Sequence, residues 1–279
     1  MAGAERKMSK EFGINTPLSE VLEKGYTLVS PKQKEARKQY VERKKHKELG
    51  YVLVNRDNVQ VVETNLTLAQ SGLLMFLTAY MKFNEEGKLF YKGERLTVTE
   101  ASKLIGKSIA QTRKEIAELE ANGLLIKEKV GRSIYLNLSE GFFKCGSVEN
   151  KFTFVKIFKK RLAEVAKQLS LNELGLLMLM LNHMHEDTHL LCMNPDEKDL
   201  RQVVLWRRKD LPEVLGVSKP FVYKTLNKFL QLKITAEVRS VNEAVVLHPS
   251  LASRKPVTPE FKDILDVIND SLTTENYKQ

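Results

Sequence analysis

The chain has 279 residues, of which 42% are hydrophobic and 29% charged, a balance that excludes a disordered chain and leaves room for two ordinary domains. No apolar run approaches the ~20 residues of a membrane span, and the N-terminus lacks the apolar stretch of a signal peptide. We therefore expect a cytoplasmic protein with no membrane partner. The 45 basic and 35 acidic residues give a net charge of +10, which favours a polyanionic partner.

Residues 31–49, PKQKEARKQYVERKKHKEL, form the first block of positive charge, with eight Lys or Arg and three Glu. Cations spread around a helix predict phosphate contacts without sequence preference, through Arg43, Lys44, Lys45 and Lys47. A solvated helix face is the alternative interpretation. We expect residues 1–50 to form a basic helical extension, and residues 51–62, YVLVNRDNVQVV, to form a β-hairpin.

An internal repeat follows. LTLAQSGLLMF from Leu66 matches LSLNELGLLML from Leu169, and LIGKSIAQTRKEIAEL from Leu104 matches VLGVSKPFVYKTLNKF from Val214. Copy one falls within residues 51–140, and copy two within residues 169–250. Gly72 aligns with Gly175 in this comparison, and Arg113 aligns with Tyr223.

Each copy reads as helix, loop, short helix, turn, longer helix and β-hairpin. Apolar spacing predicts the buried face of the longer helix in both copies: Thr112, Ile116 and Leu119 in copy one, and Val222, Leu226 and Phe229 in copy two. Three helices followed by a hairpin are the plan of a winged helix. The predicted fold is mainly α with small β-hairpins, an α+β class with two tandem winged-helix domains.

The stretch ASKLIGKS, residues 101–108, also fits the loose form of a nucleotide-binding P-loop. A P-loop must follow a buried strand, because its amides cradle phosphate only in that geometry. Residues 99–105 instead have helical spacing, and copy two lacks the lysine. We therefore interpret Gly106 and Gly216 as helix–turn–helix glycines, and Ser108 and Ser218 as caps of the following helices.

The exposed starts of the two longer helices carry side chains suited to DNA. Arginine can bind guanine and glutamine can bind adenine, while lysine, serine and tyrosine suit phosphate oxygens. The candidate residues are Ser108, Gln111, Arg113 and Lys114 in copy one, and Ser218, Lys219, Tyr223 and Lys224 in copy two. Ordinary exposed helix residues, or a protein-interaction module, are the alternatives.

The two hairpins differ in charge. The first offers Lys127, Lys129 and Arg132 around Gly131, whereas the second offers only Arg239. Copy one is therefore predicted to bind DNA more strongly than copy two. Between the copies, Phe158, Leu162, Val165 and Leu169 have helical spacing, which predicts a basic linker helix over residues 141–168 that faces phosphate with Lys156, Lys159 and Lys160.

Copy two also contains His183, His185, His189 and Cys192 within ten residues, so a zinc site is one reading. Copy one has Tyr80 and Lys82 where copy two has its first two histidines. Solvated histidines at a helix end therefore explain the pattern without a metal, and whether the four bind one is left open. Residues 251–279 are expected to form an amphipathic helix, packed on its own domain, and a tail.

The stretches LSLNELGLLMLMLNHM, RKDLPEVLGVSKPFVYKTLNKFLQLKI and VVLHPSL in copy two resemble winged-helix replication proteins of Firmicute plasmids and phages. Copy one, ending IYLNLSEGFFKCG, is similar in outline. The resemblance implies origin or operator DNA as the ligand, with Lys219 and Tyr223 as recognition-helix positions. Pro220 and Phe221 depart from the small polar residues usual there.

The first hypothesis is a non-catalytic, sequence-specific double-stranded DNA-binding protein that initiates plasmid or phage replication at origin repeats. The second is a transcriptional repressor or activator of a mobile element. The third is a nucleotide-dependent enzyme acting through residues 101–108. No cofactor or metal is expected; a homodimer and contacts with replication or transcription machinery stay open.

Overall fold

The computed structural model describes residues 17, 19, 24, 29–38, 50–56, 60–146, 153–238, 244–271 and 276–277. Its contacts divide the chain into residues 1–45 and residues 46–279. In the first unit, residues 31–38 form an exposed helix, and the Ser30 hydroxyl before it accepts from the Gln33 amide. Four predicted DNA-binding residues lie outside the described residues: Arg43, Lys44, Lys45 and Lys47.

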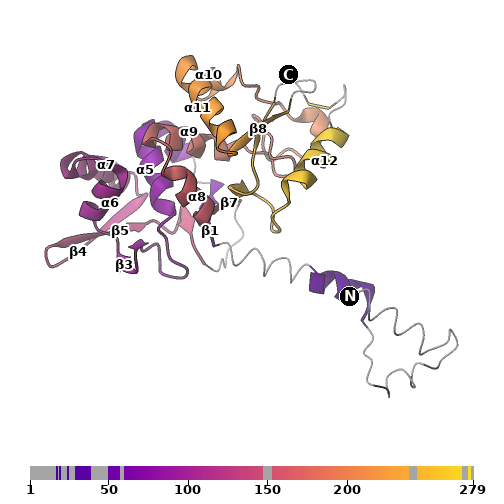
Figure 1. Ribbon diagram of the computed structural model, residues 1–279, viewed down its shortest axis with the longest axis horizontal. Helices are drawn as coiled ribbons and strands as arrows, with labels where there is room; N and C mark the ends of the chain where they lie inside the picture. The colour runs from indigo at the N-terminus through magenta and orange to yellow at the C-terminus, as the bar shows by residue number, and fades with distance from the viewer. Residues whose placement is uncertain are drawn as a thin grey trace. The chain divides into compact units, whose positions relative to one another are not determined.

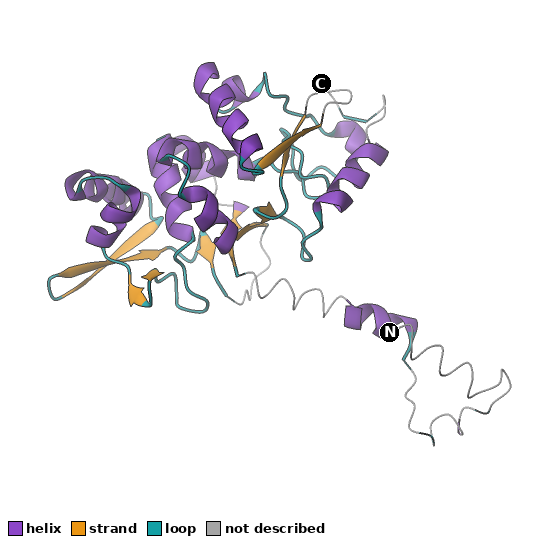
Figure 2. Ribbon diagram, in the orientation of Figure 1, coloured by secondary structure: helices purple, strands orange, loops and turns teal. Residues whose placement is uncertain are grey.

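The second unit mixes helices with small antiparallel sheets, as Figure 2 shows, and this confirms the expected α+β class. Every strand pairing in the described part of the chain is antiparallel. None of the helices found there is long and apolar enough to cross a bilayer.

Copy one has its helices and hairpin in the predicted order (Figure 1). Its elements are α5 (Leu68–Thr78), β2 (Phe90–Tyr91), β3 (Glu94–Arg95), α6 (Val98–Ile105), α7 (Ile109–Ala121), β4 (Leu125–Val130) and β5 (Ser133–Leu138). Thr67 and Thr97 start α5 and α6 with capping boxes. Gly106 ends α6 at φ 67°, a left-handed conformation that suits glycine. The P-loop-like stretch is therefore a helix–turn–helix, because α6 occupies the place where a P-loop needs a strand.

Copy two repeats this order, with a longer insertion after its first helix. Its elements are α9 (Leu171–Asn182), the 3-10 turn η2 (Leu200–Gln202), α10 (Leu211–Val214), α11 (Lys219–Gln231), β8 (Thr235–Val238) and β9 (Ala244–Leu247). A capping box at Ser170 starts α9, and Gly216 has φ 63° in the turn between α10 and α11. The predicted buried faces of α7 and α11 are both confirmed; Thr225 adds to the second.

A four-stranded sheet combines segments from outside the two hairpins. It has the order β10–β7–β1–β6, with β1 (Tyr51–Asn55), β6 (Phe143–Lys144), β7 (Phe154–Phe158) and β10 (Ala252–Ser253). Two expectations are wrong here. Residues 60–65 form helix α4 (Gln60–Asn65), so β1 pairs with β7 and not with the VQVV segment. Among the described residues of the predicted linker helix (141–146 and 153–168), only α8 (Lys159–Ala166) is helical, because β7 is a central strand with β-branched and aromatic residues.

The two copies pack through their first helices, α5 and α9. A Cβ atom added to Gly72 would lie 1.7 Å from the Leu171 carbonyl oxygen, and one added to Gly175 would lie 1.9 Å from the Leu68 carbonyl oxygen. These residues are equivalent pairs of the repeat, so the contact is reciprocal, as it is across a two-fold axis. One hydrophobic core accordingly includes residues of both copies, such as Leu73, Leu177 and Leu226.

The last helix, α12 (Phe261–Ser271), packs on copy two, as expected for this amphipathic segment. Ile264 and Ile268 are buried in a second cluster with Leu190, Leu205 and Val246. This second cluster joins α12 to β9 and to the insertion after α9, so copy two has a hydrophobic cluster in addition to the core that it shares with copy one.

Candidate nucleic-acid interface

The start of α7 presents the predicted polar side chains of copy one to solvent. Ser108 caps the helix, since its hydroxyl oxygen accepts from the Gln111 amide at 3.2 Å. Ser108, Gln111, Arg113 and Lys114 are all exposed, while Thr112 between them is buried. The helix therefore separates a core face from a polar face as the repeat predicts.

Arg113 and Lys114 form no ion pair with any residue that the structure describes. Nearby Lys107 does have a carboxylate partner, Glu115, at 3.9 Å. Two unpaired cations at the start of a helix add to the positive end of its dipole, which attracts anions. This surface has the charge and the donors that a phosphate backbone or a base edge requires.

The β4–β5 hairpin projects from the helices of copy one (Figure 1). Lys129 and Arg132 are exposed near its turn and have no ion-pair partner among the described residues. Lys127 differs, because its ammonium group lies 2.6 Å from the Glu120 carboxylate of α7. Lys129 and Arg132 are thus the better candidates for a phosphate contact.

Helix α11 of copy two presents a different surface. Ser218, Lys219 and Lys224 are exposed and Tyr223 is half-buried. The expected cap is wrong in one respect: Ser218 stands at the N-cap, but its side chain makes no capping hydrogen bond. Pro220 near the start of the helix has no amide hydrogen, so this turn has one fewer donor to satisfy. Arg239 lies outside the described residues.

The cations predicted to face phosphate between the copies have unequal positions. Lys156 is only 5% exposed; it lies on the central strand β7 and donates to the Pro256 carbonyl. Its assignment to DNA binding is therefore wrong. Lys159 is half-buried and donates to the Met81 carbonyl at 2.7 Å, whereas Lys160 is exposed at the start of α8. Lys160 is the one exposed residue of these three.

Two further candidates escaped the sequence analysis. Ile109, at the first position of α7, is 40% exposed, and an apolar side chain there can contact a thymine methyl group. Lys92 is exposed at the tight turn between β2 and β3. Sequence signals exist for both: Ile109 falls outside the inward spacing of α7, and Gly93, with φ 91°, is a residue that a tight hairpin turn favours.

His185 and His189 are buried, His183 is half-buried against Glu63, and the three have separate partners, so the expectation of solvated histidines is wrong. The His185 ring accepts from the Thr188 amide and contacts the Glu197 carbonyl at 2.8 Å, while the His189 ring contacts the Leu247 carbonyl at 3.3 Å. Burial lowers the pKa of His189 to about 4 and raises the pKa of the Cys192 thiol to about 12. Within the described residues, no three His, Cys, Asp or Glu side chains are placed to share a metal ion.

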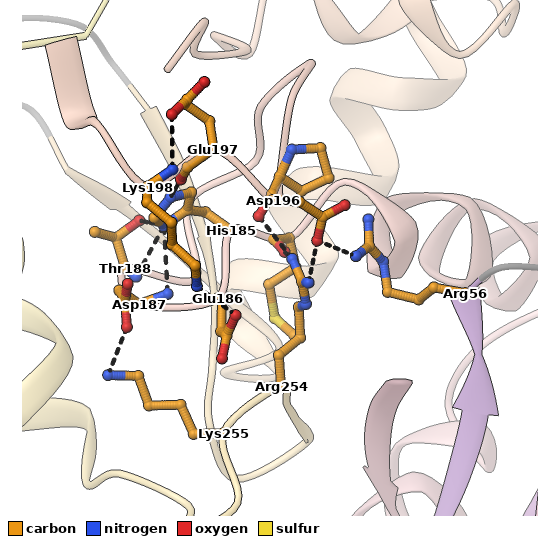
Figure 3. Close-up of polar contacts among 12 residues, drawn as sticks. Arg56, His185, Glu186, Asp187, Thr188, Asp196, Glu197, Lys198, Arg254 and Lys255 are labelled. Atoms are coloured by element: carbon orange, nitrogen blue, oxygen red, sulfur yellow. Dashed lines mark hydrogen bonds and ion pairs between the residues drawn. The ribbon is translucent and has the colours of Figure 1, made fainter. Parts of the chain in front are cut away.

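A polar network near these histidines ties the insertion of copy two to β1 and β10. Figure 3 shows Asp196 between Arg56, which follows β1, and Arg254, which follows β10. Arg254 is buried and also donates to the Met184 and Pro195 carbonyls at 3.0 and 2.7 Å. Burial raises the pKa of Asp196, but the bonds to both arginines outweigh it and the net shift is downward. We interpret the network as a structural clamp, because the terminal guanidinium nitrogens of both arginines bond to the protein itself.

Comparison of the chain with protein-family models, with curated proteins and with solved structures gave no match. The candidate interface is therefore defined by its own geometry: two repeated helix–turn–helix units, each followed by a hairpin, and joined through their first helices.

Proposed function

We propose that this protein is a sequence-specific double-stranded DNA-binding protein with two tandem winged-helix domains. The observation that carries the proposal is the start of α7. Four exposed polar side chains surround one buried threonine there, and two of them, Arg113 and Lys114, have no ion-pair partner in the described part of the chain. A recognition helix needs this arrangement in order to enter a major groove with its first turns.

The division of work within copy one follows from side-chain chemistry. Arg113 can bind the O6 and N7 atoms of guanine with two donors, and Gln111 can pair with adenine. Lys114, with Lys129 and Arg132 of the hairpin, supplies phosphate contacts that position the helix. Because the hairpin projects from the helices, its cations can reach phosphates of the DNA backbone that α7 does not contact.

The reciprocal contact of α5 and α9 supports a single chain as the binding unit. Helix–turn–helix proteins commonly place two recognition helices on DNA by forming a symmetric dimer. Here the reciprocal α5–α9 contact already joins two copies within one chain, and we propose that the chain presents both α7 and α11 to the same duplex. A homodimer would then bind additional repeats of the site.

Selection of bound duplexes from a randomised pool tests this function. We expect the full chain to enrich two short sequence blocks, with centres about one helical turn apart, ~10 base pairs. If the bound duplexes have the same sequence composition as the starting pool, the proposal is contradicted, and the protein binds polyanions without sequence specificity.

The biological role that we propose is initiation of plasmid or phage replication, which rests on the resemblance of copy two to winged-helix initiators. The test is maintenance of a plasmid that carries this gene, the DNA beside it and no other origin. Replication that is lost with Arg113→Ala supports the proposal. If the plasmid is not maintained but a reporter fused to the same DNA is regulated, the protein is a transcription regulator.

A further inference from the structure

An arginine network in copy two surrounds the residue that aligns with Arg113, whereas the network of Arg95 in copy one joins Glu128 and Asn137 of its hairpin. That residue is Tyr223 on α11. The Arg208 guanidinium lies 4.8 Å from the centre of the Tyr223 ring, and the Lys219 ammonium lies 5.6 Å from it. Two cations thus hold the aromatic ring by cation–π contacts.

Arg208 is itself fixed by partners on two elements. It precedes α10, donates to the Glu237 carboxylate of β8 at 2.7 Å, and donates to the Tyr223 carbonyl of α11 at 3.2 Å. A further bond joins it to the Asn227 side chain one turn along the helix. Arg208 and Glu237 are both about four-fifths buried, so the pair is shielded from solvent and salt.

The Tyr223 hydroxyl, in contrast, has no hydrogen-bond partner among the described residues. Both terminal guanidinium nitrogens of Arg208 bond within the protein and its Nε atom is buried, so Arg208 does not read DNA itself, but it can restrict the rotamers of the Tyr223 ring. A tyrosine hydroxyl both donates and accepts, so one held in place can bind a single base edge.

We propose that Arg208 is a positioning residue, and that the Tyr223 hydroxyl it orients reads a base edge in the half of the DNA site bound by copy two. This inference rests on the proposed function. It gives copy two a sequence preference, although Pro220 and Phe221 replace the small polar residues usual at the start of such a helix. Copy one would read with a free arginine, and copy two with a tyrosine held by an arginine.

The experiment compares four variants of the full chain with the wild type: Tyr223→Phe, Arg208→Lys, the double variant that combines these two changes, and the control Arg207→Lys. Tyr223→Phe removes only the hydroxyl group, and Arg208→Lys keeps the charge but loses the planar fork. Arg207→Lys is the matched control, because Arg207 lies beside Arg208 and pairs with Asp210, 2.9 Å away. Binding is measured on the selected duplex and on a duplex with one block scrambled, namely the block that the Arg113→Ala protein still selects.

Discrimination between these two duplexes should fall about tenfold in Tyr223→Phe and in Arg208→Lys, and it should fall no further in the double variant. Arg207→Lys should discriminate as the wild type does. If Arg208→Lys lowers the melting temperature but leaves discrimination intact, or if the two losses add, Arg208 does not act through Tyr223 and the inference is overturned. A wild type that selects no block overturns the proposed function instead.

Discussion

Copies one and two share a backbone plan but present different chemistry on it. In copy one, the cations at the start of α7 are exposed and unpaired among the described residues, and a basic hairpin projects beside them. In copy two, the corresponding tyrosine makes cation–π contacts with Arg208 and Lys219, and Arg208 is bonded to β8. The repeat therefore fixes where side chains are presented, while the individual residues decide what each copy can bind.

The largest expected effect comes from the contact that joins the copies. Gly72→Ala or Gly175→Ala would place a Cβ atom within 2 Å of a backbone carbonyl oxygen of the other copy, so α5 and α9 must separate. We expect each change to lower the free energy of unfolding by about 3 kcal/mol or more. Chemical denaturation measures this loss.

The matched control for these glycine variants is Gly141→Ala, whose nearest neighbour would be 3.8 Å from the new Cβ atom. That variant should unfold like the wild type. If Gly72→Ala is equally harmless, the two copies are not joined through close contact of α5 and α9.

Next in size is the contribution of the free arginine of copy one. Arg113→Ala should weaken binding to the selected duplex by about 1–3 kcal/mol, and should weaken binding to random DNA much less, if it reads a base. Lys224→Ala in copy two is the comparison, and it should weaken binding to both duplexes to a similar, smaller extent. An equal loss on both duplexes with Arg113→Ala would mean that this arginine only touches phosphate.

Copy two should be the more acid-sensitive half, because His189 is buried there. The pKa of His189 falls from its ordinary 6.5 to about 4 in the folded protein, so below pH 6.5 the unfolded chain binds the proton more readily. Its contribution to stability is present above pH 6.5 and is lost towards pH 4, with a loss of about 2 kcal/mol between pH 7 and pH 5.

His189→Asn tests this assignment, since asparagine tolerates the positive φ of 55° at this position. The variant should show a flatter dependence of unfolding free energy on pH between 7 and 5, whatever its stability at pH 7. A pH dependence equal to that of the wild type would place the acid sensitivity elsewhere.

The smallest effect is expected at the P-loop-like lysine, which copy two replaces with Val217. Lys107→Ala should leave ATP binding undetectable, as in the wild type, and should change DNA binding only slightly, since Lys107 lies beside Glu115. Isothermal titration with ATP and magnesium measures the first. An ATPase activity of the wild type that is lost in Lys107→Ala would instead support the hypothesis of a nucleotide-dependent enzyme.

The sequence predicted the repeated units well, because helix spacing, capping residues and turn glycines are local signals. The buried faces of α7 and α11 and the turns at Gly106 and Gly216 all follow from such signals. The four-stranded sheet could not be predicted from local signals. Its strands β1, β7 and β10 are far apart in the chain, so their pairing depends on tertiary packing. Lys156 was wrongly predicted to be exposed for the same reason. It belongs to a positively charged segment of the sequence, but its strand, β7, lies between two others in the sheet.

The sequence predicted most of the exposed residues of the candidate site, but not the hydrogen bonds and ion pairs that hold its side chains. Arg113 and Lys129 stand out from composition and spacing. The role of Arg208 does not, since it depends on Glu237 and Asn227 meeting it from β8 and α11. Side-chain networks between elements become visible only when those elements are placed in space.

The most direct test of the account is selection of DNA by three full-length proteins from one randomised duplex pool: the wild type, Arg113→Ala and Tyr223→Ala. The central claim is that one chain reads DNA through both copies. We predict two enriched blocks for the wild type, loss of one block with Arg113→Ala, and loss of the other with Tyr223→Ala. A single block that both variants abolish, or no block in any protein, would contradict that claim.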